Sequence, residues 1–231
     1  MPTGRELKRL LQPLLARRKD LAFTGRMLFF SPVTHYLRGA FFLISRFHNI
    51  PNSVAFVHQL CNGQASVDAM GNAGPQRYMM MKEDWETDLE KASQELCEQM
   101  ERCALPSVQH IVDRTQHEAT PEYVGGIVGC PSSPKYVFTV ALGACSDGDF
   151  DAAEKIMSHA MGLLSDEYPV ASATEEFRYH PILMWRMAYL MRLLQIDRSR
   201  ILPLLHDWEA HAVKGMKLTK YWKPTPFPCE M

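Results

Sequence analysis

The sequence predicts an α+β fold, in which a small antiparallel sheet of three to four strands is packed by helices and followed by an all-helical C-terminal half. Three observations support this prediction. Residues 26–61 contain three apolar runs separated by turn residues, a pattern typical of strands joined in an antiparallel meander. Most of the remaining sequence has apolar residues at helical spacing. The apolar fraction of 46% is ordinary for a globular protein.

The first predicted element is an amphipathic helix over residues 5–18. Thr3 and Glu6 have the spacing of a capping box at its start. Pro13 is expected to kink or divide the helix, because proline has no N–H to donate. The apolar stripe of this helix consists of five leucines: Leu7, Leu10, Leu11, Leu14 and Leu15.

Three strands are predicted, at residues 26–31, 36–45 and 53–61. In the second strand the side chains of both faces are apolar, which indicates a central strand covered on both sides. Residues 62–78 are rich in glycine, asparagine and alanine and predict a long loop, in which residues 65–70 could form a short fourth strand.

Two helices are predicted next, over residues 83–104 and over residues 107–117, where Pro106 opens the second one. The glycine- and proline-rich residues that follow indicate a boundary. Four parts are predicted. Residues 1–122 form the first, which contains the N-terminal helix, the sheet and the acidic helices. A connection at 123–134, a helical half at 135–219 and an extended proline-rich tail at 220–231 follow.

The helical half begins with a predicted helix pair at residues 133–145 and 150–164. Its sequence, YVFTVALGACSDGDFDAAEKIMSHAMGLL, resembles a single helical hairpin of the tetratricopeptide or pentatricopeptide type through its small residues and its Gly-Asp-Phe turn. No second copy follows at that period, and one unit cannot form a solenoid. Ordinary packing of two helices is therefore predicted.

Two further helices and a tail complete the predicted chain. Residues 181–195 are apolar almost all round, so this helix is expected to be buried in the middle of the helical half. Ser199 is expected to cap a helix that runs to about Val213. The prolines of the tail favour an extended path. Trp222 and Phe227 are expected to dock it onto the body, the alternative being a peptide offered to a partner.

The charge is small overall but unevenly distributed. The formal net charge is -1, so no global field favours nucleic acid or an anionic membrane. Residues 1–50 are basic and residues 82–122 are acidic. Two interpretations stay open: the two charged faces contact each other, or the acidic face meets a basic partner. Because the aromatic residues of the basic region lie in continuous apolar runs, they indicate core, and no nucleic-acid partner is predicted.

A cytoplasmic location without a membrane partner is expected. No apolar run reaches the roughly 18 residues that a spanning helix requires. The N-terminus lacks the uninterrupted apolar core of a signal peptide. Six cysteines without such a signal do not indicate a disulfide framework.

The sequence motifs predict neither a cofactor nor a metal. The sequence contains no GxxxxGK[ST], GxGxxG, CxxC, HExxH or GxSxG motif. His206 and His211 are five residues apart and point in different directions on a helix, which does not favour a shared metal. Cys130 is the best candidate for a reactive thiol because it lies in a Gly-Cys-Pro-Ser-Ser loop. Glu176 and His180 could pair, most simply as a structural hydrogen bond.

The N-terminal part of the sequence has a pattern of three successive features: a helix, the segment LAFTGRMLFFSPVTHYLRGAFFLISR and a third strand. This pattern is similar to that of small bacterial proteins, some of which neutralise toxins of neighbouring cells. The resemblance covers about sixty residues, includes no diagnostic motif and transfers no functional residue. It implies a binding protein rather than an enzyme.

The predicted function is therefore a non-catalytic protein-binding module, of the bacterial immunity type, that neutralises a toxin with a basic surface. The predicted partner-binding residues lie on the acidic helix: Asp84, Glu90, Glu98 and Glu101. The alternative is a small cytosolic enzyme that uses a Cys/His nucleophile. Formation of a homodimer is left open.

Overall fold

The computed structural model describes residues 3–44, 51–63, 71–72, 78–79, 88–113, 116, 134–166 and 181–231. The chain divides into two compact units. Unit 1 consists of residues 1–60, 65–123 and 213–224, and unit 2 consists of residues 61–64, 124–212 and 225–231. The predicted α+β class is confirmed, because the sheet lies in the first half of the sequence and the described second half is mainly helical.

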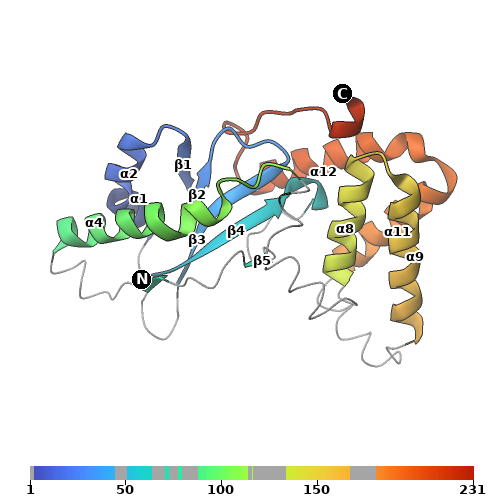
Figure 1. The fold of residues 1–231 in the computed structure, drawn as a ribbon, viewed down its shortest axis with the longest axis horizontal. Coiled ribbons are helices and arrows are strands. Elements are labelled where there is room, and N and C mark those ends of the chain that lie inside the picture. Colours follow the sequence, from blue (N-terminus) through green and yellow to red (C-terminus); the bar gives the residue numbers. More distant parts are fainter. Residues whose placement is uncertain are drawn as a thin grey trace. The chain divides into compact units, whose positions relative to one another are not determined.

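Unit 1 is built on an antiparallel meander of four strands whose order in the sheet follows the sequence (Figure 1). The long strand β3 lies between β2 and β4, which confirms its predicted central position. Two further strands of two residues each, β5 and β6, both pair with β4. The strands are β1 (Leu21–Thr24), β2 (Met27–Phe30), β3 (Tyr36–Ile44), β4 (Pro51–Gln59), β5 (Gly71–Asn72) and β6 (Tyr78–Met79). The predicted strand at 65–70 lies outside the described residues.

Strand β1 was not predicted from the sequence, and the strand expected at 26–31 is one arm of a hairpin. Thr24 pairs with Met27, so Gly25 and Arg26 form a two-residue loop. Gly25 has a φ of 59°, in the left-handed region that glycine adopts at little cost. The glycine therefore ends β1 and lets the chain return as β2.

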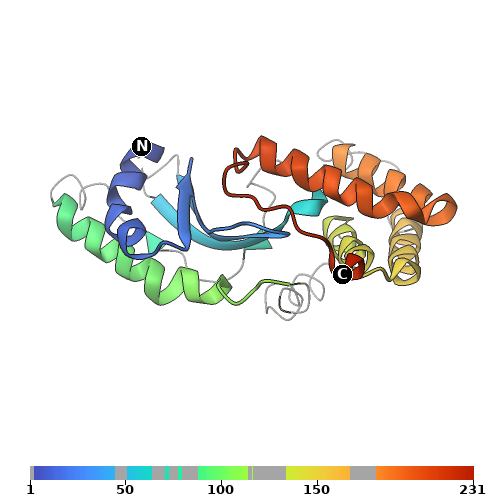
Figure 2. The ribbon, with the colours of Figure 1, turned by 90° about the horizontal axis from the view of Figure 1, so that it is seen from above.

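One face of the sheet is covered by the helices α1 (Gly4–Leu10), α2 (Gln12–Arg17) and α4 (Leu89–Gln99), which lie beside one another in Figure 2. Alternate residues of the four main strands point into this core. The strand residues of the core are Leu21, Phe23, Leu28, Phe30, Tyr36, Ala40, Phe42, Ala55 and Val57. Alternation with a period of two is what a strand with a buried face requires.

Arg38 belongs to this covered face and is half-buried among apolar side chains. Its Nη1 donates to the backbone oxygen of Ile111 at 2.6 Å. Its guanidinium carbon lies 5.2 Å from the centre of the Phe30 ring. Burial lowers the pKa of Arg38 from its usual value.

The first predicted helix is divided, as Pro13 suggested. Helix α1 ends at Leu10 and α2 begins at Gln12, with Pro13 in its first turn, where a missing N–H costs little. The predicted capping box is present: the Glu6 N–H donates to the Thr3 hydroxyl, and the Thr3 N–H donates to the Glu6 carboxylate.

The helix predicted over residues 107–117 does not continue through residues 109–113, and residues 114, 115 and 117 lie outside the described residues. Helix α4 continues through a π-helical turn, η3 (Met100–Ala104), into α5 (Leu105–Val108), which ends there. In the π turn the N–H of Leu105 donates to the Met100 carbonyl. This wider turn precedes Pro106, which has no N–H and would otherwise interrupt an α-helical ladder. Pro106 thus lies inside a continuous helical path and does not open a new helix.

The opposite face of the sheet contacts the C-terminal segment of unit 1. Phe29 meets Tyr221 edge to face, with 5.1 Å between ring centres. Val33 forms an isolated parallel bridge with Trp222, in which its N–H donates to Tyr221 and its carbonyl accepts from Lys223. The predicted docking of the tail through Trp222 is therefore confirmed.

The described residues of unit 2 form a helical hairpin and two further helices around one core. The predicted hairpin is confirmed in α8 and α9, which the turn at 147–149 joins (Figure 1). The prediction that Ser199 caps a helix is wrong, because Ser199 lies inside the turn η4 and donates to Asp197 Oδ1 at 2.6 Å. The helices are α8 (Pro134–Ser146), α9 (Phe150–Asp166), α11 (Pro181–Ile196), η4 (Arg198–Arg200) and α12 (Ile201–Gly215), whose last residues belong to unit 1.

Helix α11 is not buried on all sides, contrary to the prediction. Ile182, Trp185 and Ile196 are each at least 60% exposed. Arg186, in contrast, is 8% exposed; its Nη1 donates to the Asn62 carbonyl at 2.8 Å. An almost uniformly apolar helix thus buries one of its two arginines and leaves large apolar side chains at the surface.

The tail of unit 2 is extended up to Phe227 and then forms a short 3₁₀ turn, η5 (Pro228–Glu230). The predicted extended tail is therefore correct up to that turn. Phe227 is 1% exposed in the core of unit 2, as predicted. None of the helices in the described ranges combines the length and the apolar character that a membrane crossing requires.

Candidate functional site

Helix α4 presents two of the predicted partner-binding residues, Glu90 and Glu98, as exposed side chains. The helix begins after Asp88, whose carboxylate accepts the Lys91 N–H at 3.0 Å. Glu90 and Glu98 are eight residues apart, which is about 80° around the helix, so both fall within its exposed side. The buried side of the helix consists of Ala92, Ser93, Leu96 and Cys97.

Two polar contacts fix α4 against α1. The Ser93 hydroxyl donates to the Leu10 carbonyl at 2.6 Å, and the Cys97 thiol lies 3.6 Å from the same oxygen. Leu10 is the last residue of α1, and the carbonyls of a last helical turn need partners from outside the helix. The break between α1 and α2 therefore provides the acceptor that anchors α4.

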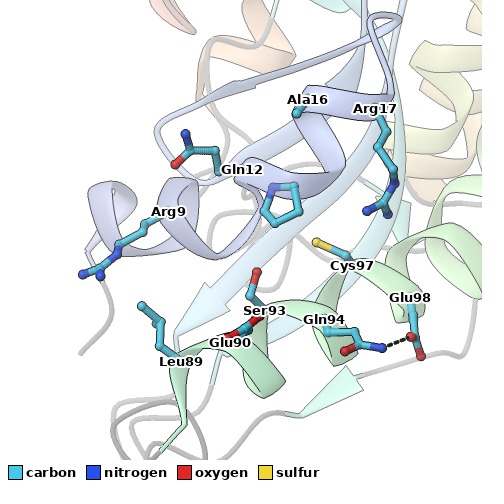
Figure 3. Close-up of a pocket in the computed structure, with 11 residues that line it drawn as sticks. Arg9, Gln12, Ala16, Arg17, Leu89, Glu90, Ser93, Gln94, Cys97 and Glu98 are labelled. Atoms are coloured by element: carbon cyan, nitrogen blue, oxygen red, sulfur yellow. Dashed lines mark hydrogen bonds between the residues drawn. The ribbon is translucent and has the colours of Figure 1, made fainter.

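A groove of about 760 Å³ lies between α1–α2 and α4, within unit 1 (Figure 3). One wall carries Arg9 and Arg17, and the other carries Glu90 and Glu98. Apolar and uncharged residues complete the lining: Gln12, Pro13, Ala16, Leu89, Ser93, Gln94 and Cys97. The groove thus has a partly apolar floor between rims of opposite charge.

Two of the charged side chains at the groove, Glu98 and Arg17, already have a polar partner. Gln94 Nε2 donates to Glu98 Oε1 at 2.9 Å. Arg17 Nη2 lies 2.9 Å from Glu101 Oε2, in an ion pair that joins α2 to the π-helical turn. Such exposed pairs contribute little free energy to folding, about 0–1 kcal/mol, so the side chains can change partners at low cost.

The four predicted partner-binding residues are therefore placed differently. The structure brings Glu90 and Glu98 together at the groove. Glu101 is half-buried and paired with Arg17 outside the groove lining. Asp84 lies outside the described residues. The ion pair also shows that the basic N-terminal segment and the acidic helix contact each other, which is one of the two interpretations that the charge pattern left open.

Several groove residues were missed by the sequence reasoning, notably Arg9, Arg17 and Gln94. Gln94 lies midway between Glu90 and Glu98 at a spacing of four, so helical periodicity alone could have placed it on the same side. The two arginines come from other helices, and only the tertiary packing reveals that they face α4.

The buried cysteines of the described residues are poor candidates for a catalytic nucleophile. Burial raises the pKa of the Cys97 thiol in the groove. In unit 2, burial and then the nearby Glu209 carboxylate raise the pKa of the Cys61 thiol well above its usual value. A raised pKa keeps these thiols protonated near neutral pH. The predicted candidates Cys130, Glu176 and His180 lie outside the described residues.

We expect thiol-labelling rates to follow this burial. Burial and then the Glu230 carboxylate raise the pKa of Cys229 from its usual value, so an alkaline pH of about 9 is used. There iodoacetamide should modify exposed Cys229 in the native chain, whereas Cys61 should react only in denaturant. The reagent attacks the thiolate, and Cys61 has neither access nor a thiolate population. Peptide mass spectrometry over a time course measures both rates. Equal rates for Cys61 and Cys229 would contradict the burial argument.

His206 lies in a second polar cluster, in unit 2. Its Nε2 is 2.9 Å from Glu230 Oε2, and its Nδ1 is 3.7 Å from buried Glu209. The Glu230 carboxylate also accepts the N–H of Phe227 at 2.7 Å. These contacts fasten the tail to α12 and explain His206 as a structural residue. Within the described residues, no group of three or more histidine, cysteine and acidic side chains is arranged to hold a metal ion.

Comparisons with protein-family models, with curated proteins and with solved structures gave no match to this chain.

Proposed function

We propose that the chain is a non-catalytic protein-binding module of the bacterial immunity type, which binds and neutralises a cognate toxin. The proposed binding surface is the exposed side of α4 with the adjoining groove. The observation that carries this proposal is the placement of two exposed carboxylates, Glu90 and Glu98, along one rim of an open groove.

The composition of the groove supports binding of a protein segment. Protein interfaces combine an apolar centre with a polar rim, and here Pro13, Ala16 and Leu89 lie between charged residues. The anchoring of α4 through Ser93 keeps this surface in place before binding, which reduces the entropy lost on association.

The charges suggest how a partner would be oriented. Basic side chains of the partner would face Glu90 and Glu98, and an acidic group or a backbone carbonyl would face Arg9. Glu101 contributes less directly, because Arg17 already engages it. Complementary rim charges chiefly raise the association rate, and this effect weakens with added salt.

The proposal is tested by capturing the partner and then reversing charges. The full chain is used as bait in an extract of its native host, and bound proteins are identified by mass spectrometry. The affinity of the captured partner is then measured for the double variant Glu90→Lys, Glu98→Lys. We expect about a tenfold or larger loss, which shrinks in high salt because the rim charges act through Coulomb attraction.

The matched control is Asp207→Lys, which makes a similar reversal on exposed Asp207 of α12, outside the proposed surface. This control should leave the affinity unchanged. An unchanged affinity of the double variant, or an equal loss in the control, would rule out α4 as the binding surface.

A further inference from the structure

A row of large side chains lies on the exposed side of α11. Ile182, Trp185, Tyr189, Arg192 and Ile196 fall within an arc of about 80° on a helix of 3.6 residues per turn. Ile182, Trp185 and Ile196 are 66%, 60% and 64% exposed. We call these five residues the α11 stripe.

Most of the α11 stripe points away from the core of unit 2, and only half-buried Tyr189 also packs against that core. The opposite side of the same helix supplies the buried residues Leu183, Met187, Leu190 and Leu194. Within the stripe, the rings of Trp185 and Tyr189 stack with an interplanar angle of 4° and 5.4 Å between centres. Stacking restricts both rings, so the stripe presents an ordered aromatic surface rather than mobile side chains.

The spacing of the stripe makes it complementary to itself. Ile182 and Ile196 are each seven residues from Tyr189. When two copies of α11 pack antiparallel about Tyr189, Ile182 of one copy faces Ile196 of the second, and the two Tyr189 rings meet near the twofold axis. Arg192 then lies next to Trp185 of the second copy, where a guanidinium can rest on the indole.

The charge of the stripe fits this arrangement. Among the five residues of the stripe, Arg192 alone is charged, and the twofold axis places it against an aromatic ring rather than another cation. The Ile182–Ile196 and Arg192–Trp185 contacts would each occur twice, and the Tyr189–Tyr189 contact once on the axis, as a twofold interface requires. We propose that the α11 stripe is the contact surface of a homodimer formed by antiparallel packing of α11 about Tyr189.

The stripe is about 21 Å long, at 1.5 Å per residue. An interface of this size corresponds to a weak association, with a dissociation constant in the micromolar range. The full chain is therefore studied by sedimentation velocity and by light scattering over concentrations from low micromolar to a few hundred micromolar. We expect a reversible shift from monomer to dimer over this range. A chain that stays monomeric throughout overturns the proposal.

The register is tested by a charge exchange. Ile182→Glu and Ile196→Lys should each raise the dissociation constant about 100-fold, because each places an unpaired charge against an isoleucine. The double variant should recover dimerisation, because Glu at 182 then faces Lys at 196 of the second copy. Both positions are exposed, so neither change disturbs the core of the monomer.

The control is Gln195→Glu, an exposed position of the same helix that lies outside the arc. It should dimerise as the unchanged chain does. Failure of the double variant to recover, while both single variants lose the dimer and keep their helical circular dichroism, would overturn the antiparallel register. A dimer that neither single variant weakens would show that another surface mediates it, which also overturns the proposal.

Discussion

Replacing Gly39 with alanine should open the sheet and lower the free energy of unfolding by about 3 kcal/mol or more. Gly39 lies in the central strand β3, opposite Phe29 of β2. A Cβ atom at this position would lie 2.0 Å from the Leu28 carbonyl oxygen and 2.7 Å from the Phe29 Cα. Both atoms belong to backbone, so only a separation of β2 from β3 relieves the overlap.

The measurement is urea unfolding followed by far-ultraviolet circular dichroism. Gly25→Ala is the control, because Gly25 needs its positive φ, yet an alanine methyl group there would meet no other atom within 4 Å. That change should cost about 1–2 kcal/mol through the backbone alone. If Gly39→Ala costs no more than Gly25→Ala, the close approach of the strands is not what requires glycine at position 39.

Replacing Phe227 with alanine should lower the free energy of unfolding of unit 2 by about 3–5 kcal/mol, the usual cost of removing a buried phenylalanine ring. Phe227 is 1% exposed, and its ring centre lies 4.4 Å from that of His206. Loss of the ring leaves a cavity beside α12 and weakens the contact of Glu230 with His206. The tail should then detach at lower denaturant concentration.

Tryptophan fluorescence follows this unfolding, because Trp208 belongs to the same core. Phe227→Leu should cost clearly less than alanine, since it keeps most of the buried volume. Met231→Ala, at a position 90% exposed, should have no effect. If Phe227→Ala unfolds at the same denaturant concentration as the unchanged chain, the ring does not anchor the tail.

The fold class could be predicted because the apolar runs in the strands are dense and the helices are strongly periodic. The predictions that were wrong concern features that depend on single residues. Strand β1 was not predicted because its four residues precede the turn at Gly25, and the helical path continues through Pro106 because a π-helical turn precedes it. The almost uniformly apolar α11 gave no indication of which side would be covered, because the buried position of Arg186 depends on the Asn62 carbonyl, far away in sequence.

The candidate site was predictable only in part, for the same reason. Helical periodicity places Glu90 and Glu98 on the exposed side of α4. It cannot reveal that Arg9 and Arg17 form the facing wall, because that depends on how the α1–α2 break at Pro13 orients two helices against α4. The acidic face predicted from composition is therefore one rim of a groove with charges of both signs.

The division of the chain between the two units has a consequence for its synthesis on the ribosome. Residues 213–224 complete unit 1 and residues 225–231 complete unit 2. Domains usually fold from the N-terminus while the chain is still being made. Here Phe29 and Val33 cannot form their contacts with Tyr221 and Trp222 until those two residues have left the ribosome. A nascent chain stalled before these residues would hold a sheet on which Phe29 and Val33 lack this cover, so chaperone binding should persist until Tyr221 and Trp222 emerge.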